Sequence, residues 1–202
     1  MTETVDEVKE VDRLMTLAEE EFGVKIGSTM LMAAIESPLG VINAYSICTA
    51  SNRMMGVALS AGDFRRTMHA QTTATGDELF VARSMILMAA RAANIMAFDT
   101  VYTDINNDAG LLRETELIYN MGFDGKSIIS PRQIATINSV FTPSTKQIEH
   151  AIHIVEAVEE SSKSGVGVLI VDGQMVDIAH VEGAKRTLQL AKAANKYEGD
   201  LV

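Results

Sequence analysis

Short apolar segments alternate with helix-forming segments along the first 140 residues, and this alternation constrains the fold more than any other feature. Four segments have the length and composition of strands: Thr29–Ile35, Met54–Leu59, Ile95–Tyr102 and Lys126–Ile129. A continuous apolar run without alternation is typical of a strand buried on both faces, as in a parallel sheet. Since parallel strands need crossover connections and the intervening segments favour helices, the sequence predicts an α/β fold with a parallel sheet.

The segments around these runs carry helix signals. Residues 4–22 place apolar side chains at helical spacing with charged residues between them. Thr4 and Glu7 are spaced as the two members of a capping box, which predicts that the helix begins there. Further helices are expected over residues 40–52, 77–94 and 110–120, and another from Ser130-Pro131 onward.

The last third of the chain has a different pattern. A long helix is expected over residues 145–163, a strand over Gly165–Gly173 and a final helix over 180–196. Gln174–Asp177 form either a returning strand or a short extension. We therefore expect two parts, a partial barrel domain over residues 1–140 and a C-terminal extension over residues 141–202.

The composition excludes several classes of function. The chain has 17 Lys+Arg against 27 Asp+Glu, which gives a net charge of −10. Nucleic acids and anionic membranes are bound through clustered positive charge, so neither is expected as a partner. Cys48 is the single cysteine, which excludes a disulfide framework and a cysteine-based zinc site. There is no apolar signal region and no run of about 18 apolar residues, so a cytoplasmic protein is expected.

Carboxylates follow three of the four predicted strands. Glu36 continues the first strand directly, Asp63 follows the second after Ser-Ala-Gly, and Asp104 follows the third. The carboxyl ends of parallel strands lie at one edge of the sheet, where the active sites of α/β proteins gather. Oxygen ligands without His or Cys suit Mg²⁺ or Mn²⁺ better than Zn²⁺. The spacing therefore makes a divalent-cation site one interpretation of these residues.

A structural interpretation stands beside it. A single Asp or Glu at a strand end commonly caps a helix or forms a turn. Asp104 and Asp108 lie in an Asn/Asp-rich loop, where turn formers are the better interpretation. Glu36 is harder to explain in this way, because it follows a fully apolar strand and a buried charge there needs a partner.

Four motifs then occur in a fixed order: Ala34-Ile-Glu-Ser-Pro-Leu-Gly40, Phe98-Asp-Thr-Val-Tyr-Thr-Asp104, Gly122-Phe-Asp-Gly-Lys-Ser-Ile-Ile-Ser-Pro-Arg-Gln-Ile134 and Asp172-Gly-Gln-Met-Val-Asp177. Together they closely resemble the citrate lyase β-subunit family, within the HpcH/HpaI aldolase–citrate lyase superfamily. The resemblance covers nearly the whole chain, and the third motif is long and specific.

The resemblance implies the C-terminal half of a (β/α)₈ TIM barrel, with four parallel strands, followed by a C-terminal extension of helices and short strands. The 202 residues are fewer than the about 250 of a typical full barrel. The half that this sequence lacks carries, in the family, an Arg that grips the oxaloacetate carboxylates. A half barrel exposes the edges Thr29–Ile35 and Lys126–Ile129, so the missing half is expected in a longer protein, in trans, or replaced by self-association.

The same resemblance implies an activity and a site. Family members cleave the citryl thioester on an acyl carrier protein, or on CoA, to oxaloacetate and the acetyl thioester. The positions of the two Mg²⁺ ligands are Glu36 and Asp63, and Glu36 is also expected to bind substrate through the metal. Asp177 matches the Asp that, in relatives, reaches a neighbouring subunit's active site, and is the candidate acid/base. Lys126 is expected to be an ion-pair partner rather than a Schiff-base nucleophile.

Several interpretations remain open from the sequence. One is a Mg²⁺-dependent lyase, or part of one, that works with the citrate lyase α subunit and acyl carrier protein and forms a homo-oligomer. A second is a catalytically silent chain that serves as an assembly partner of the same complex. A third, a general phosphate- or nucleotide-binding module, lacks any Gly-rich phosphate loop and is ranked last.

Overall fold

The computed structural model describes residues 1–164 and 169–199. The chain forms two compact units, Met1–Ile137 and Asn138–Val202. The predicted division, after residue 140, falls inside α7 (Gln133–Phe141), three residues beyond the boundary between these units.

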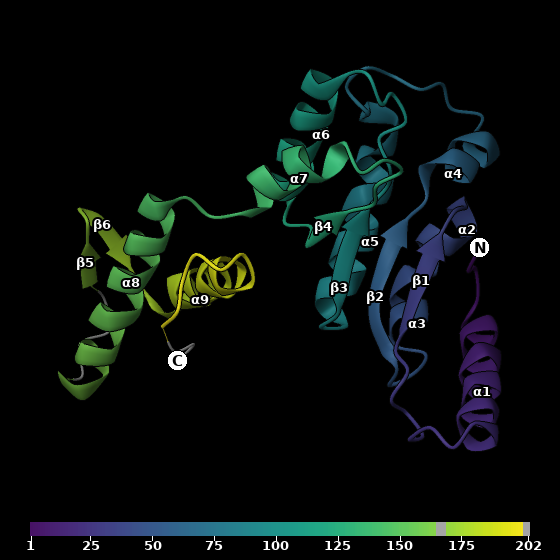
Figure 1. Cartoon of the computed structure of the whole chain (residues 1–202), viewed down its shortest axis with the longest axis horizontal. Coiled ribbons are helices and arrows are strands. Elements are labelled where there is room, and N and C mark those ends of the chain that lie inside the picture. Colours follow the sequence, from purple (N-terminus) through teal and green to yellow (C-terminus); the bar gives the residue numbers. More distant parts are fainter. Residues whose placement is uncertain (165–168, 200–202) are drawn as a thin grey trace. The chain divides into compact units, whose positions relative to one another are not determined.

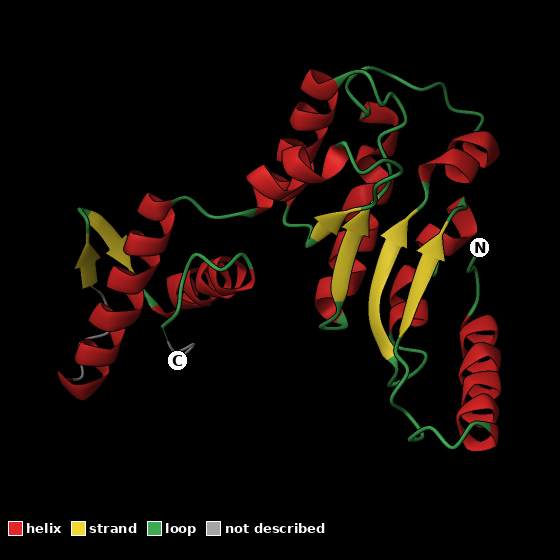
Figure 2. Ribbon diagram, viewed as in Figure 1, coloured by secondary structure: helices red, strands yellow, loops and turns green. Residues whose placement is uncertain are grey.

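The first unit is built on a four-stranded parallel sheet in the order β1-β2-β3-β4. The strands are β1 (Leu31–Ile35), β2 (Met54–Leu59), β3 (Met96–Asp99) and β4 (Gly125–Lys126). The prediction of an α/β fold with four parallel strands is thus confirmed. Figure 2 shows the arrowheads of β1, β2 and β3 at the same edge, so the carboxyl ends of these strands lie together.

Helices connect these strands. They are α1 (Val5–Glu21), α2 (Pro38–Ile42), α3 (Ala44–Cys48), α4 (Ala61–Met68), the 3₁₀ turn η1 (Asp77–Leu79), α5 (Phe80–Ala92) and α6 (Asp108–Met121). The predicted capping box of α1 is present, with Thr4 Oγ1 accepting from Glu7 N–H and Glu7 accepting from Thr4 N–H. The single helix expected over residues 40–52 is wrong: Asn43, at φ −88° and ψ 4°, separates α2 from α3.

One face of the sheet packs on helices. Helices α3 and α5 contact the strands, and α2 packs on α3 and α5 (Figure 1). Alternate strand residues are fully buried, including Ile35, Val57 and Leu59. The strand residues between these point to the other face of the sheet, and among them Met32 and Met96 are exposed. Parallel sheets are normally covered on both faces, whereas this second face is only partly covered among the described residues.

Two glycines of the sheet leave room for the ring of Phe98. Phe98 lies against Gly56 and Gly125 on the neighbouring strands, and a Cβ added at either glycine would come within 3.1–3.2 Å of its ring. The predicted fourth strand is also shorter than expected. Ser127 N–H still bonds to the carbonyl of Asp99, but the chain then leaves the sheet and Ile128 and Ile129 are exposed.

Helix α1 is fastened to the start of β2 by Arg53. The guanidinium bonds to Asp12 and Thr16 on α1, to Glu19 near the end of α1, and to the carbonyl of Thr29 before β1. Arg53 and Glu19 are both buried. The hydrogen bonds from Arg53 hold the pKa of the Glu19 carboxyl well below its ordinary value.

The second unit has a small core of its own. It contains α8 (Thr145–Ser164), the antiparallel pair β5 (Leu169–Val171) and β6 (Gln174–Val176), and α9 (Ile178–Ala193). The interpretation of 174–177 as a returning strand is therefore correct, whereas the first residues of the predicted strand, 165–168, lie outside the described residues. Asp172 and Gly173 both have positive φ, as a two-residue hairpin turn requires.

Side chains from both helices and both strands form that core, among them Ile148, Val171, Val176 and Leu188. Asp172, at the turn, contacts His150 and His153 of α8. Across the described parts of the chain, no helix is both long and apolar enough to cross a membrane.

Candidate functional site

Glu36 and Asp63 follow two strands that lie side by side. Strands β1 and β2 end in register, Ile35 opposite Leu59, and Ser60 N–H donates to the carbonyl of Ile35 at 2.8 Å. The chain therefore leaves both strands at the same place, the carboxyl edge of the sheet. The predicted pair of carboxylates belongs to this one edge.

Glu36 is held at its strand end by the helix that follows immediately. Ser37 is the N-cap of α2 and accepts from Gly40 N–H, and Pro38 occupies the first helical position. Proline suits that position because its missing N–H has no intrahelical partner there anyway. The side chain of Glu36 is 20% exposed and lies 4.0 Å from the amino group of Met1.

Asp63 lies in the first turn of α4 and is half exposed. Its Oδ1 accepts from Nε and Nη2 of Arg66, at 3.0 and 2.9 Å. Both contacts fall on the same carboxylate oxygen. A carboxylate in the first turn of a helix is also favoured by the helix dipole.

The donor set fits a magnesium ion. Within residues 1–164 and 169–199 no group of three His, Cys, Asp or Glu side chains could hold a metal. Glu36 and Asp63 are two carboxylates that follow adjacent strands. Mg²⁺ is commonly held by one or two carboxylates, with waters and substrate oxygens completing its shell. Zinc sites, by contrast, use three or four N or S ligands as a rule.

The third strand-end carboxylate is not Asp104. Strand β3 ends at Asp99, five residues earlier, and Asp104 lies exposed in the following loop. Its Oδ1 accepts from Asn106 N–H, which is the role of a turn former. The interpretation of Asp104 as a turn former, which the sequence favoured, is therefore correct.

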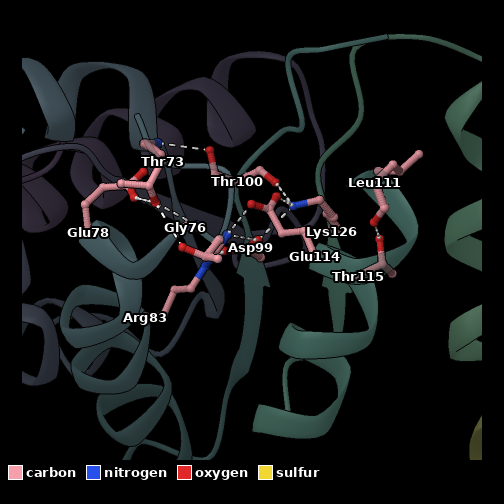
Figure 3. Close-up of polar contacts among 12 residues, drawn as sticks. Thr73, Gly76, Glu78, Arg83, Asp99, Thr100, Leu111, Glu114, Thr115 and Lys126 are labelled. Atoms are coloured by element: carbon pink, nitrogen blue, oxygen red, sulfur yellow. Dashed lines mark hydrogen bonds and ion pairs between the residues drawn. The ribbon is translucent and has the colours of Figure 1, made fainter. Parts of the chain in front are cut away.

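Asp99 occupies the strand end instead, inside a buried network of charges (Figure 3). Arg83 binds both carboxylate oxygens, at 2.8 and 2.9 Å, and Lys126 Nζ binds Oδ2 at 2.8 Å. Glu114 of α6 completes the group, 2.5 Å from Lys126 and 3.2 Å from Arg83. The prediction that Lys126 is an ion-pair partner is confirmed.

The sequence contains one signal that points to Asp99. It directly continues the apolar residues of β3, as Glu36 continues those of β1. Burial by itself would raise the pKa of the Asp99 carboxyl, but the charge of Lys126 and the hydrogen bonds from Arg83 hold the pKa below its ordinary value. Asp99 is thus an ionised structural anion under the rim rather than a proton carrier.

Asp177 belongs to the second unit. It directly precedes α9, and its side chain is 49% exposed. Its Oδ1 lies 2.8 Å from Nδ1 of His180, and its backbone N–H points at the same nitrogen at 3.2 Å. The carboxylate is therefore accessible and has a titratable neighbour.

Two other features, the Cys48 thiol and a cavity beside β1, are not part of the strand-end pair of carboxylates. Burial raises the pKa of the Cys48 thiol to about 11, which keeps it protonated and unreactive. A cavity of about 600 Å³ lies between α1 and β1, lined by residues such as Val8, Val11 and Met32. Neither Glu36 nor Asp63 lines it, although Met1, whose amino group lies 4.0 Å from Glu36, does.

Comparison with known proteins gives a consistent result. The family model HpcH/HpaI aldolase/citrate lyase matches residues 1–131. The chain is 50% identical over 198 residues to citrate lyase subunit beta of Leuconostoc mesenteroides subsp. cremoris, covering 98% of this chain and 66% of that protein. It is 44% identical over 197 residues to the same subunit of Haemophilus influenzae, covering 98% and 68%. The chain thus spans about two thirds of the length of these relatives.

Solved structures resemble it too. Protein CitE from Mycobacterium tuberculosis, in complex with magnesium, acetoacetate and coenzyme A, aligns with TM-score 0.68 and 29% identity over 83% of this chain and 63% of that one. The citrate lyase β subunit from the same organism, complexed with oxaloacetate and magnesium, aligns with TM-score 0.58 and 26% identity over 70% and 59%. A citrate lyase from Burkholderia xenovorans, at 15% identity, shares the fold, with TM-score 0.81 over 100% and 64%.

Proposed function

Because the chain belongs to the HpcH/HpaI aldolase/citrate lyase family, we propose that it is a lyase subunit that cleaves a citryl thioester to oxaloacetate and an acetyl thioester. The thioester is carried on an acyl carrier protein or on CoA. The observation that carries the proposal is the pair of carboxylates, Glu36 and Asp63, at the ends of two hydrogen-bonded parallel strands.

The fold proposed with this function is half of a (β/α)₈ barrel. Its support is the order of four parallel strands, each followed by helix, together with the open sheet face at Met32 and Met96. In a closed barrel such residues are covered by side chains from the other strands. The relatives, which are longer than this chain, have length for those strands.

Glu36 and Asp63 are the residues that would hold Mg²⁺, or Mn²⁺, at this edge. The ion, when bound, supplies positive charge beside the hydroxyl and carboxylate oxygens of the citryl group. Two relatives of known structure have magnesium bound, one of them together with oxaloacetate. Glu36 is then also the residue through which substrate is bound.

The reaction breaks the bond between the hydroxyl-bearing carbon and the carbon next to the thioester. The hydroxyl proton leaves, the hydroxyl oxygen becomes the ketone of oxaloacetate, and the electron pair of the broken bond goes to the thioester fragment. That fragment must then gain a proton on carbon. Asp177 is the proposed acid/base group, supported by its exposed carboxylate and its contact with His180.

The partners follow from the same proposal. A β subunit acts with an α subunit and an acyl carrier protein, and self-association into a homo-oligomer would cover the open sheet face. The second candidate function is an assembly partner of that complex without catalysis. The fact that favours it is that the chain spans only about two thirds of the relatives' length.

A coupled assay separates these functions. Oxaloacetate released from citryl-CoA is measured by its reduction with malate dehydrogenase and NADH, with Mg²⁺ and with EDTA. We expect Mg²⁺-dependent release that is lost in Glu36→Gln and Asp63→Asn, because either change removes one of two ligands. Asp104→Asn, which neutralises a loop carboxylate near the same rim, is expected to behave as the wild type.

Release that persists with EDTA would contradict the metal-dependent mechanism. Absence of release would favour the assembly partner, provided that the chain elutes together with the α subunit and acyl carrier protein in size-exclusion chromatography. Absence of both release and co-elution would contradict both candidate functions.

A further inference from the structure

The helix that carries Asp63 is capped by a residue far away in sequence. Helix α4 begins after Ser60, whose side chain makes no capping hydrogen bond. The N–H of Ala61, the first residue of α4, instead donates to Oγ1 of Thr100 at 3.0 Å, and both residues are buried. The first N–H groups of a helix have no intrahelical partner, so this bond satisfies a donor that would otherwise be unpaired.

Thr100 is itself held rigidly. It directly follows β3 and is 3% exposed. Its carbonyl accepts from Lys126 Nζ at 2.7 Å, and that ammonium is bound to Asp99 (Figure 3). A β-branched side chain has few χ1 positions, so the place of the hydroxyl is set by the backbone. The buried charge network therefore determines where the Thr100 hydroxyl lies.

This bond acts on the strand-end site through the first turn of α4. Asp63 is two residues beyond Ala61 in that turn, and the preceding Ser60 is tied to the end of β1 by its bond to Ile35. We propose that Thr100 is a positioning residue for the divalent-cation site: its hydroxyl fixes the first turn of α4 and thereby the position of Asp63 relative to Glu36. The inference rests on the proposed function of these two carboxylates.

A purely structural role for a buried hydroxyl is the alternative, and the chain contains a matched control. Thr115 of α6 is also buried, and its Oγ1 donates to the carbonyl of Leu111 at 2.7 Å within the same helix (Figure 3). Thr115→Val removes one buried hydroxyl bond, as Thr100→Val does, but the lost bond lies within α6 and not on α4. A structural role predicts the same outcome for both variants.

The test measures Mn²⁺ binding to the full chain by electron paramagnetic resonance of the free ion. We expect Thr100→Val to weaken Mn²⁺ binding on the order of 10-fold, as is typical for residues that orient a metal ligand. Thr100→Ser, which keeps the hydroxyl, and Thr115→Val should bind as the wild type does. Amide hydrogen exchange should be faster at the start of α4 in Thr100→Val and unchanged there in Thr115→Val.

The Asp63→Asn variant distinguishes a failure of the positioning role of Thr100 from a failure of the metal assignment. If Asp63→Asn loses Mn²⁺ binding while Thr100→Val retains wild-type affinity, the positioning role is overturned and the metal assignment stands. If Asp63→Asn binds as the wild type does, the metal assignment fails and the inference fails with it. Thr100→Ala provides a second variant, which removes the hydroxyl without placing a methyl group against Ala61.

Discussion

Asp99 joins two buried cations at the carboxyl end of β3. Its carboxylate has no exposure and is the shared partner of Arg83 and Lys126. Breaking a buried ion pair costs much more than the pair contributes, since the remaining charge has no partner and no water. Removing the Asp99 carboxylate should therefore destabilise the fold, because it leaves the buried charges of Arg83 and Lys126 without this partner.

Asp99→Asn should lower the free energy of unfolding by about 3–5 kcal/mol, because Arg83 and Lys126 stay buried with Glu114 as their one remaining anion. The measurement is urea unfolding followed by circular dichroism. Glu116→Gln, on the exposed side of α6, is the control and should stay close to wild type. Equal effects of the two substitutions would argue against the network.

The same residue predicts a pH dependence. The pKa of Asp99 is lowered in the folded chain, so its contribution to stability is complete above the unfolded value of about 3.9 and is lost as the pH falls below it. The free energy of unfolding should therefore decrease as the pH is lowered below about 3.9. In Asp99→Asn this part of the fall should be missing, and parallel curves for the two proteins would contradict the prediction.

The places of the carboxylates near the strand ends could be predicted to different degrees. Glu36 could be placed because it directly follows a well-defined apolar run. Asp99 was missed as a strand end because Val101 and Tyr102 extend the apolar run beyond it, so that the third strand was predicted too long. Which of several carboxylates is buried depends on partners such as Arg83, sixteen positions from Asp99, and no local pattern specifies that pairing.

At the scale of elements, Arg53 makes several of the bonds that attach α1 to the sheet, and Ser51 Oγ adds another to Asp12. Arg53→Met removes its bonds to Asp12, Thr16 and Glu19 together, and leaves the Glu19 carboxylate buried without this partner. Amide hydrogen exchange across α1 should become faster, while the amides of β2 and β3 keep their protection. Arg13→Met, whose ion pair with Glu10 is exposed and lies within α1, should leave exchange unchanged.

Elements with local signals were predicted well, and those decided by packing were not. The capping box of α1 is a local signal, as is the apolar run of β2. The break at Asn43 arises where a short connection must turn from the end of β1 back across the sheet, and composition alone does not mark it. Likewise β4 ends after Lys126, whose ammonium turns into the charge network, although the apolar residues continue.

At the scale of the whole molecule, the open face of the sheet predicts association. Exposed Met32 and Met96 lie on a sheet in which no further described strand pairs with the outer edge of β1, where Thr2 N–H bonds to the carbonyl of Ala34. Uncovered strand edges and apolar sheet faces favour pairing with another chain. Sedimentation velocity should show concentration-dependent oligomers, reduced in Met32→Lys and unchanged in Met88→Lys, which alters an exposed methionine on α5. A monomer at all concentrations would contradict this.

Glu36 and Asp63 are proposed to form a divalent-cation site at the ends of β1 and β2, and calorimetric titration with Mg²⁺ measures its occupancy. We expect one bound ion per chain in the wild type and in Asp104→Asn, with binding lost in both Glu36→Gln and Asp63→Asn. Mg²⁺ binding that is unchanged in either ligand variant would contradict the account.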